Sequence, residues 1–442
     1  MAGRIPQQFI DDLLARVDIV DVVDARVPLK KQGSNWVACC PFHDEKTPSF
    51  SVSPTKQFYY CFGCGAGGTA LGFLMEYDHL DFVEAVERLA ADVGVEVPRT
   101  GGGRRDDAGL EPLYAALAAA DRYYQARLRE SPEAIDYLRQ RGISGRTAKR
   151  FGLGYAPAGW RHLIDEADAG SVEDLVRAGL VNRNESDRVY DRFRGRLMYP
   201  IRDRRGRTIA FGGRVLDDGT PKYLNSPETP VFHKARELYG LYEARRARRD
   251  PARLLVVEGY MDVIALAEAG IDYAVATLGT ATGQPHVERL FSVTSEVVFC
   301  FDGDEAGRQA AWRAVTNTLP ALTDGREARV LFLPEGEDPD SMVRHEGQDA
   351  FERRVAAATP LADFLIERLR AGVDTTSVGG RAQLAAEAGP LLATMPAGVY
   401  HDLLLDRLAT QVGLSPDRLR ADLAGAADRN RRRPAAGAER AA

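Results

Sequence analysis

The N-terminal part of the chain shows a helical pattern, then a strand pattern, then a second helical pattern. Apolar residues recur at helical spacing near the start and predict one helix. These residues are Phe9, Leu13, Val17 and Val20. Short β-type runs follow, separated by turns that contain Pro or Gly. These runs are residues 36–38, 49–52 and 57–60, and a helical pattern covers 69–93. Residues 1–97 therefore predict a small domain of helices and strands.

Residues 98–109 interrupt this patterning. They read PRTGGGRRDDAG, with three consecutive glycines between charged residues and nothing large and apolar to bury. Such a composition is typical of a flexible linker and marks a domain boundary. Residues 110–250 are mixed: two helical patterns come first, and Gly-punctuated strand-like segments follow. The helical patterns are 113–128 and 134–141, and the strand-like segments include 196–203 and 208–216.

Residues 251–345 alternate most regularly between apolar runs and helical stretches. The runs are residues 254–259, 273–279, 297–304 and 328–336. Buried strands that alternate with helices are typical of a parallel α/β sheet. Residues 346–427 are helical in pattern, and the low-complexity tail 428–442 is expected to be disordered. The fold class is therefore α+β and multidomain, with an α/β part.

Composition narrows the class of protein. A length of 442 residues suffices for about three domains, and 45% hydrophobic with 28% charged residues is ordinary for a globular protein. No run approaches the ~18 apolar residues of a membrane span, and MAGRIPQQFI lacks a signal-peptide core. Five cysteines are too few for a disulfide scaffold. We therefore expect a cytoplasmic protein that is neither fibrous, secreted nor membrane-embedded.

Charge is distributed unevenly along the chain. The net charge is −6, yet residues 183–249 hold 17 Arg or Lys against 9 Asp or Glu. That segment carries +8 and the remainder −14. A basic segment in an acidic chain suggests a phosphate-rich partner. Only seven of the 58 basic residues are Lys, and an Arg excess can also reflect genome composition, so charge alone does not identify the partner.

One group of soft ligands has the spacing of a metal site. Cys40 and His43, then Cys61 and Cys64, form two pairs with two residues inside each pair. Such pairs converge from tight turns, and three Cys with one His suit tetrahedral zinc. Four protein ligands leave no open position, so the zinc is expected to be structural. Cys39 is an adjacent thiol that could replace Cys40, although the two-residue register favours Cys40.

The same stretch contains two further patterns. Residues 63–68 match G-x-G-x-x-G but overlap a metal ligand and do not join a strand to a helix, so we reject a dinucleotide site. Aromatic residues with nearby lysines either stack single-stranded bases or form the small core, and the sequence leaves both open. These residues are Phe50, Phe58, Tyr59 and Tyr60, with Lys46 and Lys56.

Carboxylates follow three of the apolar runs of the α/β part. The acidic residues are Glu258, Asp262, Asp302, Asp304, Asp338 and Asp340. The carboxyl ends of parallel strands share one edge, so these side chains are expected to gather in one crevice, with Asp302 and Asp304 on one side of a strand. Like charges at this density require divalent cations, and oxygen ligands select Mg²⁺ or Mn²⁺. Such a site suits phosphoryl transfer. The sequence has neither a Gly-Lys-Ser/Thr P-loop nor a G-x-S-x-G elbow.

Taken together, these motifs resemble the bacterial replicative primases of the DnaG family. The resemblance rests on the Cys/His quartet and on YDRFRGRLMYPIRD, FGGRVL, PKYLNSPET, FHKARELYGL, VVEGYMD, FDGD and GEDPD, in that order. It implies an N-terminal zinc ribbon, then an RNA polymerase domain with a basic subdomain (110–250), a toprim catalytic subdomain (251–345) and a helical subdomain (346–427). It also implies synthesis of short RNA primers on single-stranded DNA from ribonucleoside triphosphates.

The resemblance also assigns roles to individual residues. It makes Glu258 the catalytic glutamate and Asp262 a further active-site acid, and it implies magnesium ligands at Glu258, Asp302, Asp304, Asp338 and Asp340. Template or nucleotide contacts fall on Arg150, Arg196, Arg202, Arg214, Lys222, Asn225 and Lys234. The family's helicase-binding domain is expected to be missing, because the chain ends near where it would begin.

Two other functions remain open from the residues. Another toprim protein, a topoisomerase or a nuclease, would break phosphodiester bonds instead of making them. A zinc-ribbon DNA-binding protein without catalysis would tolerate the loss of Asp302. The zinc quartet together with PKYLNSPET favours the primase.

Overall fold

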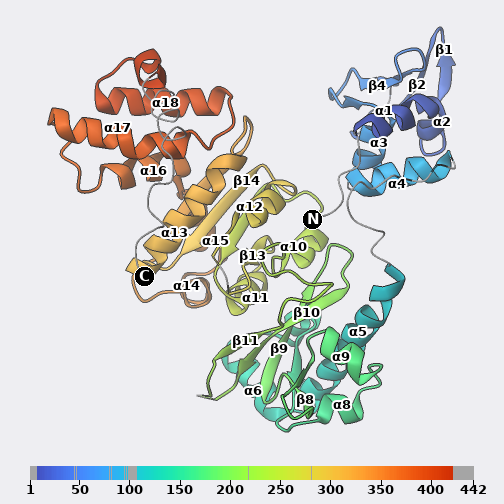
Figure 1. Cartoon of the computed structure of the whole chain (residues 1–442), viewed down its shortest axis with the longest axis vertical. Helices are drawn as coiled ribbons and strands as arrows, with labels where there is room; N and C mark the ends of the chain where they lie inside the picture. Colours follow the sequence, from blue (N-terminus) through green and yellow to red (C-terminus); the bar gives the residue numbers. More distant parts are fainter. Residues whose placement is uncertain are drawn as a thin grey trace, which may run out of the picture. The chain divides into compact units, whose positions relative to one another are not determined.

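The chain folds into two compact units, Met1–Gly109 and Leu110–Ala442. The computed structural model describes residues 7–43, 45, 47–78, 80, 82–93, 95, 97, 107–217, 219–279 and 281–421. Figure 1 shows the helices and strands of both units, and each unit has its own hydrophobic core. The predicted linker 98–109 lies outside the described residues except for 107–109, and the predicted tail 428–442 lies wholly outside them. Among the described residues, no helix is long and apolar enough to span a membrane.

The first unit packs helices against an antiparallel sheet with the strand order β1-β2-β3-β4-β5. Its strands are β1 (Lys30–Gln32), β2 (Asn35–Ala38), β3 (Phe50–Ser53), β4 (Phe58–Cys61) and β5 (Gly67–Gly68). Its helices are α1 (Gln7–Arg16), α2 (Ile19–Asp24), α3 (Ala70–Tyr77) and α4 (Phe82–Asp92). Along β4, Tyr59 and Cys61 are buried while Phe58 and Tyr60 are exposed, as the alternation of strand side chains requires.

Both long helices predicted for this unit are divided in two. The predicted N-terminal helix is α1 and α2, because the Asp18 side chain accepts a hydrogen bond from the Val20 N–H at 2.9 Å and starts a new helix. The predicted helix over 69–93 is α3 and α4, and the Thr69 hydroxyl caps α3. Apolar spacing continued across both breaks, so periodicity alone did not reveal them.

The second unit begins with helices around an antiparallel sheet of order β11-β10-β9-β6 and a β7–β8 hairpin. The strands are β6 (Gly154–Ala156), β7 (Val181–Arg183), β8 (Val189–Asp191), β9 (Arg196–Arg202), β10 (Thr208–Val215) and β11 (Tyr223–Asn225). The helices are α5 (Asp107–Arg129), α6 (Pro132–Gln140), α7 (Gly145–Phe151), α8 (His162–Glu166), α9 (Val172–Arg177) and α10 (Leu241–Ala247).

A five-stranded sheet of order β13-β12-β14-β15-β16 follows in the same unit. Its strands are β12 (Leu254–Val257), β13 (Ala274–Ala276), β14 (Glu296–Phe301), β15 (Glu327–Phe332) and β16 (Thr359–Pro360). The first four are parallel, which confirms the predicted α/β part. Strand β16 was not predicted, and it pairs antiparallel with β15 inside the stretch expected to be helical.

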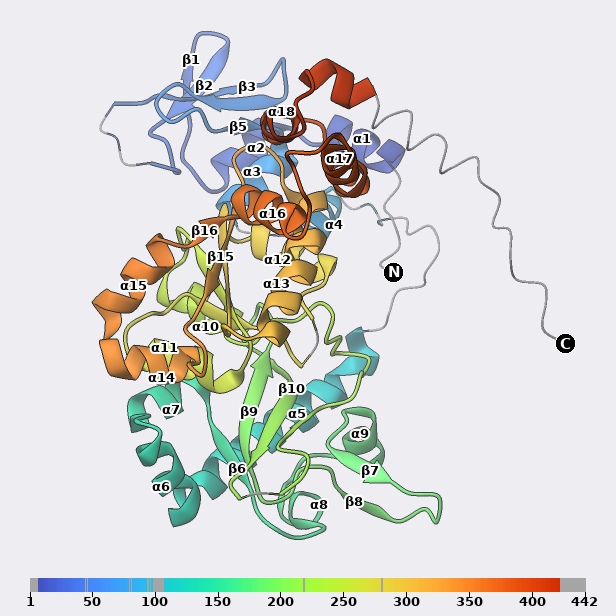
Figure 2. The ribbon, with the colours of Figure 1, turned by 90° about the vertical axis from the view of Figure 1, so that its left-hand side faces the viewer.

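Helices cover both faces of this sheet (Figure 2). They are α11 (Tyr260–Glu268), α12 (Gln284–Phe291), α13 (Glu305–Thr318), α14 (Pro339–Glu346) and α15 (Gln348–Ala356). Helices α11 and α14 lie on one face, and α12 and α13 lie on the other. A short 3-10 turn, η1 (Leu319–Ala321), precedes β15, and three more helices complete the described chain. These are α16 (Leu361–Arg370), α17 (Val378–Leu392) and α18 (Val399–Val412).

The order of the sheet determines where a ligand can bind. From β12, the chain moves to β13 on one side and then returns to β14 on the other side. Side chains that follow β12 and β14 therefore face a crevice at the carboxyl edge, where the strand order reverses. The α+β multidomain class is confirmed by this combination of sheets.

Candidate functional site

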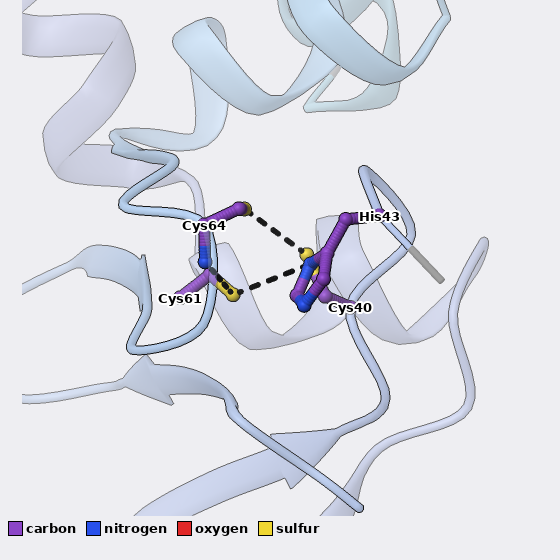
Figure 3. Close-up of side chains that lie close together, drawn as sticks. All are labelled: Cys40, His43, Cys61 and Cys64. Atoms are coloured by element: carbon purple, nitrogen blue, oxygen red, sulfur yellow. Dashed lines mark hydrogen bonds between the residues drawn. The ribbon is translucent and has the colours of Figure 1, made fainter. Parts of the chain in front are cut away.

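The Cys/His quartet converges in the first unit. Sulfur atoms of Cys40, Cys61 and Cys64 and a ring nitrogen of His43 all lie within 4.8 Å of one another (Figure 3). Cys61 ends β4, and the other three residues lie on the loops after β2 and β4. Cys39, the alternative thiol, is exposed, while Cys40 is buried in the cluster.

The separations within the quartet fit a tetrahedral zinc ion. The sulfurs of Cys40 and Cys64 are 3.8 Å apart, and His43 Nδ1 is 3.8 Å from the Cys61 sulfur. Zinc–sulfur bonds of about 2.3 Å at tetrahedral angles separate two sulfurs by about 3.8 Å. The donor set therefore fits zinc in both kind and spacing.

The surroundings of Cys61 favour its thiolate. Burial raises the pKa of this thiol, but the Ser49 hydroxyl and the backbone N–H groups of Cys64 and Gly63 outweigh burial and lower the pKa to about 6. A thiolate is the form that binds zinc. A Cβ at Gly63 would lie 2.6 Å from His43 Nε2, so only glycine allows the imidazole to approach here.

Glu45 supports this centre and was not predicted from the sequence. Its carboxylate lies 3.3 Å from His43 Nε2 and accepts hydrogen bonds from the Cys40 N–H at 2.6 Å and the Ser49 N–H at 3.0 Å. A carboxylate behind a ligating histidine fixes the ring and leaves the other nitrogen for the metal. His43 Nδ1, which faces Cys61, is that nitrogen.

The acidic residues stand at the carboxyl edge of the second unit's parallel sheet. Glu258 follows β12 directly, and Asp302 follows its neighbour β14. Asp304 and Asp338 precede α13 and α14. A Cβ at Gly303 would lie 2.2 Å from the Leu333 carbonyl oxygen, so glycine lets the ends of β14 and β15 approach closely.

Helix starts orient three of these carboxylates. Asp262 accepts from the Gly259 N–H at 2.9 Å, Asp304 from the Gly307 N–H at 2.7 Å, and Asp338 from the Ser341 N–H at 2.7 Å. Our reason for placing Asp302 and Asp304 on one side of a strand is wrong, because β14 ends at Phe301 and Asp304 caps a helix. Each capping carboxylate has a second oxygen that this hydrogen bond does not use.

Electrostatic coupling indicates that these acids face one another. Burial raises the pKa of Glu258, and Asp302 and Asp304 raise it further. Burial also raises the pKa of Asp302, with contributions from Asp304 and Asp338. In the described part of the chain, however, only the Cys/His quartet brings three or more ligand atoms as close together as a bound metal requires.

Asp340 is engaged by arginines. It is buried, Arg141 Nη1 lies 3.1 Å from one oxygen, and Arg344 Nε lies 2.9 Å from the other. Arg141 was not identified from the sequence, because it lies 199 residues before its partner Asp340. The Arg141 guanidinium also lies over the Tyr137 ring, 5.7 Å from its centre.

The antiparallel sheet brings cations toward these acids. Arg214 on β10 lies 5.1 Å from the centre of the same Tyr137 ring and bonds the Tyr223 hydroxyl at 3.1 Å. Tyr223 is close enough to Asp262 for that carboxylate to raise its pKa, although burial is the larger cause. Arg214, Tyr137 and Arg141 thus connect the basic sheet to the acidic edge.

Asn225 at the end of β11 connects the antiparallel sheet to residues that follow strands of the parallel sheet. Its side-chain N–H donates to the Leu278 carbonyl at 2.9 Å, and its oxygen accepts from the Tyr260 hydroxyl at 2.7 Å. Tyr260 begins α11, two residues after Glu258. Asn225 therefore positions the basic sheet against the start of α11.

One of the predicted contact residues is exposed, and three have internal partners. Lys222 is exposed and Lys234 is half-buried. Arg196 is buried and donates to the carbonyls of Gly213 and Lys222, both at 3.4 Å. Arg202 pairs with Glu243, and Arg150 pairs with Asp272. The guanidinium groups of Arg150 and Arg202 are therefore engaged by carboxylates of the fold itself.

Comparisons with known proteins match four successive parts of the chain to known families. Residues 5–105 match the family described as a CHC2 zinc finger, and residues 123–245 match the N-terminal domain of the DNA primase catalytic core. Residues 255–343 match a Toprim-like family, and 362–417 match the DnaB-helicase binding domain of primase. The fold and its sites thus define a Toprim protein with an attached zinc ribbon.

Similarity to complete proteins identifies the family. The chain is 58% identical to a DNA primase of Pseudomonas putida over 430 residues, which is 95% of this chain and 65% of the relative. It is 52% identical to a DNA primase of Escherichia coli K12, over 94% of this chain and 73% of the relative. A solved DnaG primase catalytic domain bound to ssDNA is 48% identical, with a TM-score of 0.67, over 71% of this chain and 100% of that chain. The chain belongs to the DnaG family of bacterial DNA primases.

One expectation about partners is wrong. We expected the family's helicase-binding domain to be missing, but residues 362–417 match the helicase-binding domain of primase. This segment covers most of α16 and all of α17 and α18. Its helical pattern was recognised, but nothing in that pattern identified a binding role.

Proposed function

We propose that this chain is a template-directed RNA polymerase that makes short RNA primers on single-stranded DNA. The observation that carries the proposal is the contact chain from Arg214 through Tyr137 to Arg141 and Asp340, which connects a cationic sheet to an acidic edge. Such a pair of surfaces suits phosphate-bearing substrates held against a metal-dependent centre. The ssDNA bound to the related catalytic domain supports this template.

We infer that the acidic edge binds one or more divalent cations. Mg²⁺ or Mn²⁺ would activate the attacking hydroxyl and neutralise charge on the leaving phosphate. Glu258, Asp302, Asp304 and Asp338 would hold the cations, because each has carboxylate oxygen that is not committed to an arginine. Asp340 instead holds Arg141 and Arg344 at the start of α14. The raised pKa values of Glu258 and Asp302 fit this demand for positive charge.

We assign the template and nucleotide contacts to Lys222, Lys234 and Arg214, with Arg196 and Asn225 as supports behind them. Arg196 bonds the Lys222 carbonyl, and Asn225 fixes Tyr260. Arg202 and Arg150 act inside the fold through Glu243 and Asp272. The boundaries of the subdomains at 110–250, 251–345 and 346–427 are part of this proposal.

The proposed partners are single-stranded DNA, ribonucleoside triphosphates and a replicative helicase. The helicase follows from the family match of residues 362–417. In that segment, Val399 and Leu403 of α18 are 64% and 63% exposed, which is unusual for large apolar side chains and suits a protein contact. We also infer a cytoplasmic location, since the replicating chromosome would supply the template.

Primer synthesis is tested on circular single-stranded DNA with Mg²⁺ and labelled ribonucleotides. The proposal predicts short RNA products that depend on the template, and no nicking or relaxation of supercoiled plasmid. Cleavage or relaxation without ribonucleotide incorporation would favour the topoisomerase or nuclease alternative. DNA binding with neither reaction would favour the non-catalytic zinc-ribbon protein.

A further inference from the structure

Lys234 is held through its backbone by two side chains. The carboxylate of Glu228 accepts a hydrogen bond from the Lys234 N–H at 3.0 Å. On the other side, the imidazole of His286 lies with Nε2 2.8 Å from the Lys234 carbonyl oxygen. The lysine therefore has a fixed backbone, although it lies in a segment between β11 and α10 that contains no helix or long strand.

His286 is suited to this role by its own surroundings. It is only 1% exposed and lies in the first turn of α12. The Gly283 N–H donates to His286 Nδ1 at 3.2 Å, so Nδ1 is the acceptor and Nε2 carries the proton given to Lys234. Burial lowers the pKa of this imidazole, which keeps the neutral form that these two bonds require. Arg289 on the same helix forms an ion pair with Glu237 at 2.9 Å, which adds a second contact between α12 and the segment that contains Lys234.

The ammonium group of Lys234, by contrast, is available. Among the residues that the structure describes, no carboxylate pairs with it, and the side chain is half-buried beside a segment that is itself anchored. A backbone that is already fixed loses little further conformational entropy when the lysine binds a ligand. A cation presented in this way is preorganised for a phosphate.

We propose that His286 is a positioning residue that holds the Lys234 ammonium in place for a phosphate of the template or the incoming nucleotide. This inference rests on the proposed function, which assigns the phosphate contact to Lys234. His286 does not touch the ligand; it acts only through the Lys234 carbonyl. Glu228 is the second support of the same lysine, on the N–H side.

The test is a double-mutant cycle on the full chain, read out as the salt dependence of ssDNA binding. His286→Leu removes both hydrogen bonds at similar volume, and His286→Gln supplies a donor and an acceptor again. Loss of one phosphate contact lowers the slope of log K against log salt by about 0.7. We expect that loss in His286→Leu and in Lys234→Ala, no further loss in the double variant, and recovery in His286→Gln.

Lys222→Ala is the matched control, because His286 does not contact Lys222, and its effect should add to that of His286→Leu. Additive effects of His286→Leu and Lys234→Ala would overturn the inference. The inference would also be overturned if His286→Leu bound ssDNA like the wild type while Lys234→Ala bound it weakly. If Lys234→Ala itself binds normally, the assignment of Lys234 fails instead. If His286→Leu does not fold, Glu228→Ala at the exposed support replaces it and must show the same lack of additivity.

Discussion

Asp262 links the acidic edge to the stability of the protein. Burial, together with the charges of Asp338 and Asp340, raises the pKa of this carboxyl to about 8. Its unfolded pKa is about 3.9. A group whose folded pKa is raised contributes stability below the unfolded pKa, and that stability is lost as pH rises through the folded pKa. Metal-free protein should therefore lose stability through Asp262 between about pH 4 and pH 8.

The variant Asp262→Asn should not show that loss, because the amide keeps an oxygen for the Gly259 N–H and carries no charge. Urea unfolding in EDTA measures the free energy of unfolding of the variant and the wild type at pH 5 and pH 8. The variant should be more stable than the wild type by a larger margin at pH 8. Asp324→Asn is the control, since hydrogen bonds from the Tyr400 and Val399 N–H groups lower the pKa of Asp324. Asp324 is ionised in the folded and the unfolded protein at both pH values, so this variant should change stability equally at pH 5 and pH 8. An equal effect of Asp262→Asn at both pH values would contradict the assignment.

At the residue scale, short-range spacing was informative and long-range pairing was not. The Cys/His quartet could be predicted because two-residue spacing reports a shared turn. Glu45 has no characteristic spacing to the zinc ligands, and Arg141 and Asp340 are far apart in the sequence and close only in the fold. Arg202 and Arg150 were predicted as ligand contacts, but a charge in the sequence does not reveal an internal partner such as Glu243 or Asp272.

The zinc ribbon is the element whose stability depends most on one ion. Structural zinc contributes about 10–16 kcal/mol in zinc-finger peptides. We expect Cys61→Ala to lose zinc and unfold the first unit, while the second unit keeps its unfolding transition because it has a separate core. Elemental analysis and calorimetry measure the two effects. Cys39→Ala is the matched control and should keep one zinc; loss of zinc there would contradict the quartet.

The burial of the aromatic residues on β3 and β4 distinguishes the two roles that the sequence left open, which are base stacking and core packing. Phe50 and Tyr59 are fully buried core residues, whereas Phe58 and Tyr60 are 41% and 42% exposed, and Lys46 lies outside the described residues. Stacking of a base on an aromatic side chain contributes about 1–3 kcal/mol. Tyr60→Ala should therefore weaken ssDNA binding about tenfold without lowering the melting temperature.

Tyr59→Ala is the comparison on the same strand. It removes a buried ring and should destabilise the first unit by about 3–5 kcal/mol. Binding assays and thermal unfolding of the full chain distinguish the two variants. Unchanged ssDNA affinity in Tyr60→Ala would show that the exposed face of β4 does not bind bases.

At the element scale, the strands and helices of the parallel sheet could be predicted because each apolar run is long enough to be buried on both faces. Strand β16 could not, since two residues between helices carry no periodicity. The break in the predicted N-terminal helix could not be predicted for a different reason. Asp18 is a cap, and a cap changes the course of the chain without changing the spacing of its apolar residues.

At the scale of the whole molecule, the basic segment 183–249 overstates the charge available to a ligand. Arg183 pairs with Glu173, Arg207 with Asp203, and Arg202 with Glu243. Of the predicted contact residues, only Lys222 is exposed, and Lys234 is half-buried. Few phosphate contacts imply weak, salt-sensitive binding, which suits the proposed primer synthesis, since it must start at many places and release its template.

Template-directed ribonucleotide incorporation by Asp302→Asn tests the central claim most directly. The substitution keeps the shape of a side chain at the end of β14 and removes its charge from the acidic edge. We predict a loss of about a hundredfold or more, with zinc content and unfolding unchanged, and near-normal incorporation by Glu305→Gln, an exposed acid one residue beyond Asp304. Incorporation by Asp302→Asn within about twofold of the wild type would contradict the proposal that these carboxylates support the chemistry.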